Sequence, residues 1–166
     1  MATATYDLIA SQTLGSAASS ITFSSIAASW TDLRVVLIFQ GGAANSSRYY
    51  FNNDTTALYS QNYMYGDGTS TATGSINNQS YLYMSTSLGA PTTNFALVTI
   101  DVFSYAGSTY KTVLETISDD RNGSGMVYRN SGLYRSTSAI NRIDFTINGT
   151  TLAAGTTASL YGIKAA

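Results

Sequence analysis

The chain has 166 residues, with eight basic and nine acidic side chains, no histidine and no cysteine, and a formal net charge of −1. This length suits one domain with a substantial core, so we treat residues 1–166 as a single domain. The basic residues are scattered, which argues against binding to a nucleic-acid backbone. The lack of cysteine excludes disulfides, and the lack of histidine removes the commonest general base and metal ligand.

The N-terminal stretch reads MATATYDLIASQTLG and has no basic region followed by a long apolar run, so we expect no signal peptide. The sequence also lacks the uninterrupted apolar segment of about 18 residues that a membrane-spanning helix needs. Charged residues make up only 10% of the chain. A net charge near zero weakens the repulsion between copies and therefore favours association.

Short runs of alternating apolar and polar residues predict strands along the whole chain. The expected strands are residues 6–13, 20–24, 33–40, 48–52, 62–65, 80–85, 94–105, 110–118, 126–130, 140–147 and 158–164. The run LRVVLIFQ at 33–40 is the most apolar and predicts a central, buried strand. Asp54 predicts the cap of a single helical turn through Ser60. The polar stretch GDGTSTATGSINN at 66–78 is interpreted as an exposed loop.

No long segment carries the apolar stripe of a helix, so the sequence predicts an all-β protein of about ten short strands. Repeats of the length found in solenoids and propellers are absent from the sequence. We therefore expect a two-sheet antiparallel β-sandwich, jelly-roll-like in topology. The last strand, at 158–164, is expected to pair with the first, at 6–13, and to close the sheet.

A weak candidate for a cation site lies at Asp120, Asn122 and Ser124, which alternate in sequence ahead of Gly125. Three oxygen ligands with this spacing resemble the first half of a calcium loop. The bidentate glutamate that would complete such a loop is missing, because position 131 is serine. The alternative is a polar hairpin turn built on Asn122-Gly123, and no cofactor is expected.

Catalytic groups are sparse in this sequence. Asp119 and Asp120 are adjacent, so in a strand they point to opposite faces. Without histidine or cysteine, a serine nucleophile would need Lys111 or Lys164 as its base. We therefore expect a protein that is not an enzyme.

Thirteen tyrosines stand out in a chain of this size, and five of them cluster near an acidic residue. The candidates for a glycan site or a protein interface are Tyr49, Tyr50, Tyr59, Tyr63, Tyr65 and Asp67. Aromatic faces beside amides and carboxylates suit sugar rings. The same composition suits a subunit interface or a core, since tyrosine buries a large area and keeps a polar tip.

Several blocks of the sequence, in their order, resemble small virion structural proteins of tailed bacteriophages. The blocks are YDLIASQTLGSAASSITFSSI with TDLRVVL, then RYYFNND, and finally GLYRSTSAINRIDF with AAGTTASLYGIKAA. The resemblance implies a β-sandwich subunit that forms a symmetric oligomer on a virus particle. It carries over no active-site residue, because the matching residues belong to strands and turns.

Two functions are compatible with this resemblance. The first is a capsid decoration, or cement, protein that binds the major capsid protein on the outer surface of the head as a homotrimer. The second is a tail-fibre or appendage domain that contacts other tail proteins and a glycan of the host surface. In both cases we expect a virion location after synthesis in the bacterial cytoplasm, with no nucleic-acid partner and no membrane insertion. A hydrolase of cell-envelope sugars is the third reading, disfavoured by the missing catalytic groups.

Overall fold

A computed structural model of the chain describes residues 5–85, 89–121 and 124–165. Twelve strands in the described residues form two antiparallel sheets. The large sheet contains, in spatial order, β1 (Tyr6–Thr13), β12 (Thr157–Ile163), β3 (Asp32–Phe39), β8 (Ala96–Phe103), β9 (Lys111–Asp120), β10 (Gly125–Tyr134), β5 (Tyr59–Gly66) and β6 (Thr71–Gln79). The small sheet contains β2 (Ser20–Phe23), β11 (Ile143–Ile147), β4 (Ser47–Phe51) and β7 (Leu82–Tyr83).

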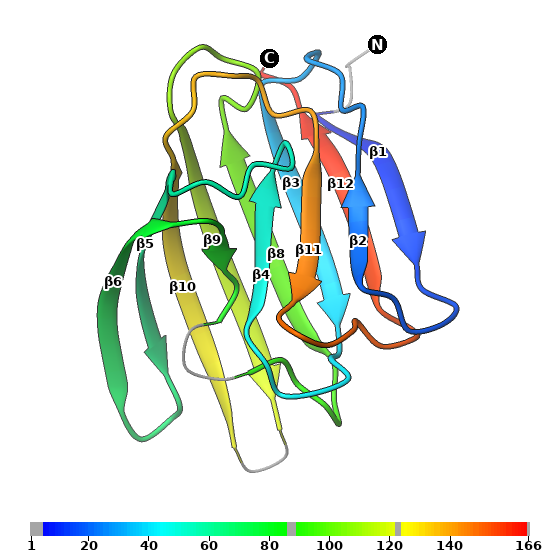
Figure 1. Cartoon of the computed structure of the whole chain (residues 1–166), viewed down its shortest axis with the longest axis vertical. Coiled ribbons are helices and arrows are strands. Elements are labelled where there is room, and N and C mark those ends of the chain that lie inside the picture. Colours follow the sequence, from blue (N-terminus) through cyan, green and yellow to red (C-terminus); the bar gives the residue numbers. More distant parts are fainter. Residues whose placement is uncertain (1–4, 86–88, 122–123, 166) are drawn as a thin grey trace.

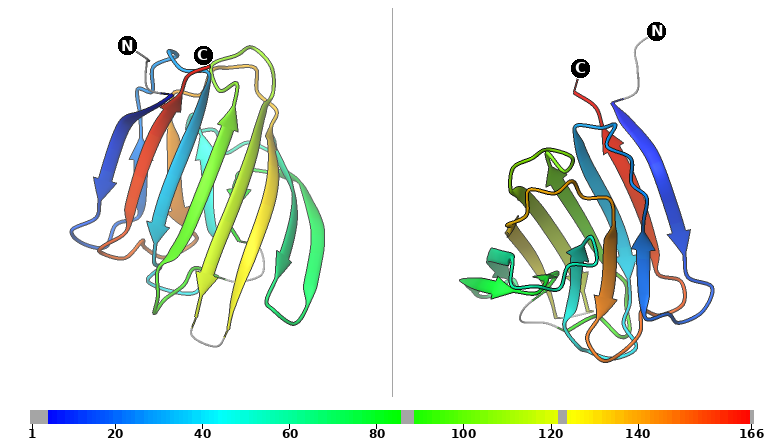
Figure 2. Two further views of the ribbon diagram at one scale, coloured as in Figure 1. Left: turned by 180° about the vertical axis from the view of Figure 1, so that it is seen from behind. Right: turned by 45° about the horizontal axis from the view of Figure 1, so that its top comes forward.

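The small sheet covers only part of the large one. Figure 1 shows β4, β11 and β2 in front of β8, β3 and β12, whereas β5 and β6 lie to the left of the small sheet. Figure 2 shows the same arrangement from behind, where the strands of the large sheet lie side by side and no other described strand covers them. The predicted all-β sandwich is therefore confirmed. Among the described residues, no helix has the length and apolar character needed to cross a membrane.

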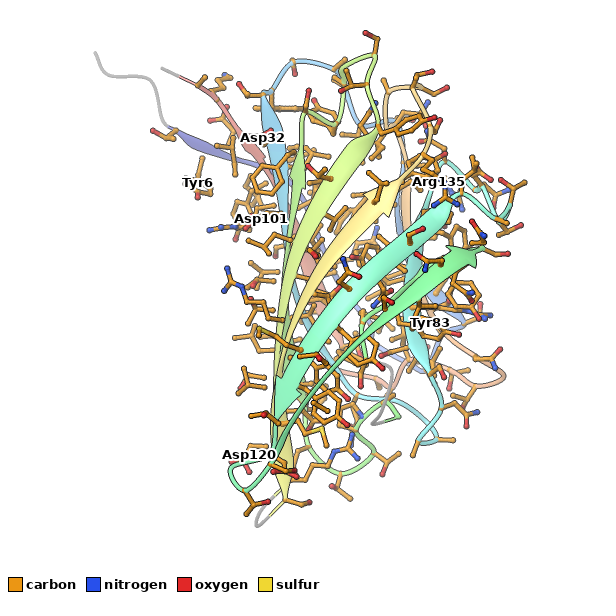
Figure 3. All side chains as sticks on the ribbon, turned by 90° about the vertical axis from the view of Figure 1, so that its left-hand side faces the viewer. Tyr6, Asp32, Tyr83, Asp101, Asp120 and Arg135 are labelled. Atoms are coloured by element: carbon orange, nitrogen blue, oxygen red, sulfur yellow. The ribbon has the colours of Figure 1, made fainter. Side chains whose placement is uncertain are left out.

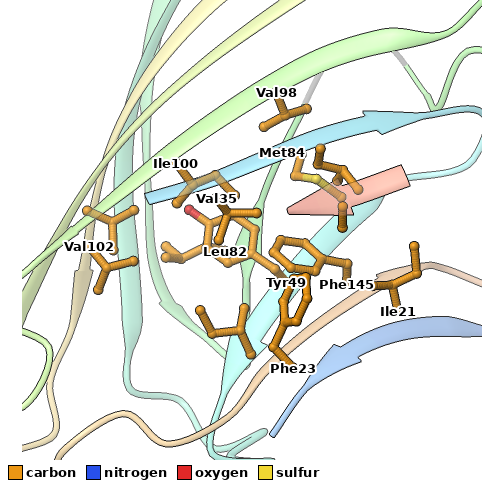
Figure 4. Packing of buried hydrophobic residues seen from close by; sticks show 14 of the residues in the cluster. Ile21, Phe23, Val35, Tyr49, Leu82, Met84, Val98, Ile100, Val102 and Phe145 are labelled. Carbon is orange, nitrogen blue, oxygen red and sulfur yellow. The ribbon is translucent and has the colours of Figure 1, made fainter. Parts of the chain in front are cut away.

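The core lies between the two sheets and is built by alternation along the strands. In β3, Leu33, Val35 and Leu37 are fully buried, while the residues between them face away from the core. Figure 4 shows Val35 opposite Tyr49 and Phe145 of the small sheet. Each such side chain stabilises the fold by roughly 1.5–3 kcal/mol when it is fully buried, so the alternation that predicted the strands also holds the sheets together.

The first and last strands pair as expected, with Tyr6 opposite Ile163 and Thr13 opposite Thr157. A bulge between Leu8 and Ala10 shifts the register within β1. Next to the Asp7–Gly162 pair, the ring of Trp30 packs against Gly162, where a Cβ atom would lie 2.3 Å from the ring carbons. Only glycine leaves room for that ring over β12, which explains why position 162 in the stretch SLYGIKAA is glycine.

Two local predictions are wrong. The predicted helical turn from Asp54 through Ser60 is absent: residues 54–58 form a non-helical turn, in which Asp54 Oδ1 accepts the backbone N–H of Thr56 at 2.9 Å, and β5 begins at Tyr59. The stretch 66–78 is a hairpin and not a loop: Asp67 to Ser70 form the turn, and β6 then pairs with β5. Backbone pairing to β5 stabilises a strand whose own residues have little apolar alternation.

Candidate binding surfaces

The outer face of the large sheet, which points away from the small sheet, exposes several large apolar side chains. We call it the open face. Seven of the nine large hydrophobic side chains that are exposed in the described residues lie on it: Tyr6, Leu8, Ile38, Met64, Leu97, Phe103 and Val127. Several large apolar side chains exposed on one face make that face a candidate for contact with another molecule.

Charges at the centre of the open face neutralise each other. Arg34 of β3 forms a bidentate ion pair with Asp101 of β8, with distances of 2.6 and 2.8 Å from guanidinium nitrogens to carboxylate oxygens. The same guanidinium lies 5.6 Å from the ring centre of Tyr6. Figure 3 places Tyr6 and Asp101 on the same side of the large sheet. Because the pair is satisfied internally, this region presents almost no net charge to a partner.

A second surface is a shallow hollow of about 790 Å³ on the outer face of the small sheet. Its walls include Arg48, Tyr50, Tyr81, Thr146 and Thr150. We call it the tyrosine hollow. The guanidinium of Arg48 lies 4.6 Å from the ring centre of Tyr81, and its Nε donates a hydrogen bond to the Thr146 hydroxyl at 3.3 Å. Aromatic faces, a cation and hydroxyl groups thus meet in one place, which suits a sugar or another small polar ligand.

The structure separates the tyrosines that cluster in the sequence. Tyr49 and Tyr59 belong to the core, and the hydroxyl of Tyr59 accepts the N–H of Phe51 at 3.0 Å. Of the tyrosines predicted from the sequence, only Tyr50 lines the tyrosine hollow. Tyr81 and Arg48 were not among the sequence candidates. They meet because β4 pairs with β7, placing Arg48 opposite Tyr83, and sequence reasoning alone does not reveal that pairing.

Tyr63 and Tyr65 lie elsewhere, on the inner face of β5 beyond the small sheet. Their rings stack with centres 6.3 Å apart, and Tyr65 also packs against Tyr128 at 4.8 Å. The ring of Tyr63 covers Gly74 of β6, where a Cβ would lie 2.5 Å from the Tyr63 hydroxyl oxygen. These two rings are half-buried and stabilise the β5–β6 hairpin from its inner side.

Asp67 holds the turn of that hairpin. Its carboxylate accepts the backbone N–H groups of Ser70 at 2.7 Å and Thr69 at 2.9 Å, together with both hydroxyl groups of these residues. The hydrogen bonds from Ser70 and Thr69 lower the pKa of Asp67 well below its ordinary value. Both carboxylate oxygens are used within the turn, so this side chain is a structural residue.

The predicted cation site is only partly described, since Asn122 lies outside the described residues. Around it, the N–H of Arg121 donates to the carbonyl of Ser124 at 2.6 Å, and the Arg121 guanidinium contacts Asp119 at 2.7 Å. Within the described ranges, no group of three acidic side chains gathers where a metal ion could bind. The alternative, a polar hairpin turn built on Asn122-Gly123, also lies outside the described residues, so both readings remain predictions.

A buried polar cluster inside the sandwich was not expected from the sequence. Glu115 is fully buried on the inner face of β9, and its Oε1 accepts a hydrogen bond from Asn130 at 2.9 Å. Burial raises the pKa of Glu115 well above its ordinary value, which outweighs the opposing effect of that hydrogen bond. The neighbouring Gln61 is also buried and bonds to the backbone of Tyr83 in β7. These groups join the two sheets.

Lys111 is buried at the other end of β9. Its ammonium group donates hydrogen bonds to the carbonyls of Gly107 at 2.6 Å and of Thr109. Burial lowers the pKa of Lys111. The other lysine, Lys164, forms an ion pair with Asp7 at 3.0 Å. Both lysines that were weighed as bases are therefore engaged in local structure.

Among the described residues, the open face and the tyrosine hollow are thus two surfaces that offer side chains to a partner. No protein-family model and no curated protein matches the chain.

Proposed function

We propose that this chain is a structural subunit of a tailed-bacteriophage particle, and specifically a capsid decoration protein. The open face is the observation that carries the proposal. It combines exposed apolar side chains with an internally neutralised ion pair, and such a surface is stabilised when a neighbouring subunit covers it. The sequence blocks that resemble virion structural proteins support the same conclusion, as does the low charge of the whole chain.

In this proposal the partner of the open face is the major capsid protein at the outer surface of the head. Burial of apolar side chains gives the attachment free energy, and it needs no charged groups. The homotrimer expected from the resemblance remains part of the proposal, and light scattering on the purified protein measures it. If light scattering finds a stable monomer, the proposed trimer is wrong, whereas the proposed attachment to the capsid is unaffected.

Antibody labelling of the virions that carry this protein tests the proposal directly. We expect label distributed over the whole head surface in electron micrographs. Label confined to the tail would overturn the decoration function in favour of an appendage. Absence of label from every part of the particle would overturn both functions. Heads that lack the protein and then bind it when it is added back provide the matched control.

A second candidate function is an appendage domain that binds a glycan of the host surface, and the tyrosine hollow favours it. Tyr81 offers a ring already held by Arg48, and Tyr50 and Thr146 line the same hollow. Stacking on such a ring contributes roughly 0.5–1.5 kcal/mol. Binding of a sugar there would place its hydroxyl groups near the threonines.

A glycan array probed with Tyr81→Ala tests this second function. Loss of the stacking platform is expected to weaken binding by up to about tenfold. Tyr110→Ala is the matched control, because Tyr110 is exposed and does not line the hollow. If the wild-type protein binds no glycan, or if both variants bind equally well, the hollow is not a glycan site.

A further inference from the structure

Strands at the edge of a sheet expose unpaired backbone groups, and three of the four sheet edges in the described residues carry features that limit pairing. Strand β1 has a bulge between Leu8 and Ala10, and its Asp7 bonds to Trp30 and Lys164. Bulges and charges are the usual means of protecting an edge. The first edge of the large sheet is therefore poorly suited to a further strand.

Both edges of the small sheet are covered by side-chain amides. Gln12 of β1 donates to the carbonyl of Thr22 in β2 at 2.6 Å. Gln61 of β5 accepts the N–H of Tyr83 in β7 at 2.7 Å and donates to its carbonyl at 3.2 Å. The strands themselves are short, with four residues in β2 and two in β7. Neither edge offers a continuous row of free backbone groups.

Strand β6, at the far edge of the large sheet, also has a register shift, between its pairs Gln61–Ile76 and Tyr59–Gln79, but its remaining length differs from the other three edges. It has nine residues, TATGSINNQ, without a charge or a proline, and it pairs regularly with β5 from Thr71 to Ile76. The whole stretch from Gly68 to Ile100 lacks charged residues. Figure 3 looks onto this edge, where β6 lies in front of β5 with no other described strand on its outer side. A long, uncharged edge is a template for pairing with another strand.

The hairpin turn determines which backbone groups of β6 face outward. It is closed by a bond of 3.2 Å from the N–H of Asp67 to the carbonyl of Ser70. Residue pairs of an antiparallel ladder alternate between bonding to each other and turning their backbone groups away. Counting from the closed pair, Thr71, Thr73 and Ser75 direct their N–H and carbonyl groups away from β5.

We propose that β6 pairs with β6 of a second copy of this chain, antiparallel and about a two-fold axis at Thr73. Around this axis Thr73 lies opposite its own equivalent, and Thr71 lies opposite Ser75. Cross-strand pairs of hydroxyl side chains are favourable, and no like charges are brought together. The contact joins the two large sheets edge to edge into one continuous sheet.

The sequence of β6 fits a second copy better than a foreign peptide. Peptides that add to a sheet edge are selected by pockets for alternate side chains. The outward residues of β6 are small and nearly uniform hydroxyl residues, which suit their own symmetry-related equivalents. A two-fold contact of this kind leaves the open face free. The proposed homotrimer could therefore still use β6 to contact a neighbouring trimer. This inference does not rest on the phage proposal.

A single cysteine tests the register, because the chain has no cysteine of its own. In Thr73→Cys the two thiols would lie opposite each other, with Cα atoms about 5.5 Å apart, a distance that a disulfide spans. We expect mild oxidation to convert most of this variant into a covalent dimer that reductant reverses. Thr112→Cys is the control, since Thr112 is exposed on β9 inside the sheet. Equal cross-linking of both variants, or none of Thr73→Cys, would overturn the proposal.

Charge pairs give an independent test by light scattering. Thr73→Lys and Thr73→Glu each place two like charges opposite each other across the axis, so each variant alone is expected to lose the contact. A mixture of the two is expected to regain it, and its mass should exceed that of either variant alone. If the mixture has the same mass as each variant alone, β6 does not pair with its equivalent about Thr73, and the proposal is wrong.

Discussion

Two carboxyl groups in this molecule have pKa values shifted in opposite directions, and the causes are visible in their surroundings. Glu115 is fully buried, and burial disfavours its charged form. Asp67 is exposed, and its charged form accepts hydrogen bonds from the backbone and side chains of Thr69 and Ser70. At neutral pH, Glu115 therefore lowers the stability of the fold, because the unfolded chain ionises this group more easily than the folded chain does. Asp67 raises the stability, because the folded chain favours its charged form.

The pH dependence of stability follows from these directions. Folded Glu115 keeps its proton above the ordinary glutamate pKa of 4.5, where the unfolded chain releases it. The free energy of unfolding therefore falls as the pH rises from about 4.5 to the raised native pKa. Glu115→Gln removes this loss, so the variant is expected to be more stable than wild type at pH 7.

Denaturant unfolding at pH 4 and pH 7 measures this effect. The stability gain of Glu115→Gln is expected at pH 7 and should shrink towards pH 4. Asp67→Asn is a control of opposite sign. The lowered pKa of Asp67 stabilises the fold above the ordinary aspartate value of 3.8, so this variant is expected to be less stable than wild type at both pH 4 and pH 7, and the difference should disappear only well below pH 3.8. A Glu115→Gln variant less stable than wild type at pH 7 would show that the charged carboxylate is accommodated in the core.

At the level of elements, alternation in the sequence predicted the strands that lie under the small sheet. The first strand, Tyr6–Thr13, has the expected bounds, and the apolar run at 33–40 is the central β3. Strand β6 was missed for a physical reason. Neither of its faces is covered by the small sheet, so its residues have no need to alternate between apolar and polar. A strand held mainly by its backbone leaves little signal in its side chains.

The tyrosine hollow was predictable only in part, because its residues come from strands whose order the sequence does not reveal. Successive residues of a strand point to opposite faces, so Tyr49 enters the core while Tyr50 lines the hollow. The partners of Tyr50 in the hollow come from β11 and from the segment next to β7, and their proximity depends on strand order. The jelly-roll prediction remains a prediction. It is favoured by the way the chain alternates between the large and small sheets from β1 to β4.

The link between β5 and β7 gives a prediction for these elements. Gln61→Leu removes the amide that bonds to the backbone of Tyr83, so a partly buried N–H loses its partner. We expect the variant to lose about 1–3 kcal/mol of unfolding free energy. Asn62→Leu is the matched control, because Asn62 is exposed on the other face of the same strand. Equal stability of the two variants in urea would show that β7 does not depend on this amide.

For the whole molecule, the surfaces offered to partners contain few unpaired charges. Association through the open face or through β6 is therefore expected to persist from about 0.05 to about 1 M sodium chloride, because these contacts contain few charge–charge attractions that salt could screen. Sulfate should strengthen it by favouring apolar burial. Light scattering across this range measures the effect, and dissociation at high salt would indicate a charged interface. The mixture of Thr73→Lys and Thr73→Glu is the salt-sensitive control.

The position of β12 has a consequence for how the chain reaches this structure on the ribosome. In the large sheet, β1 is synthesised first, yet its one neighbour is β12, which is synthesised last and is inserted between β1 and β3. Strands β8, β9 and β10 are consecutive in both sequence and space, so they can pair while synthesis continues. We expect the first strand to remain unpaired until β12 has been synthesised, and the sheet to close in a comparatively slow step.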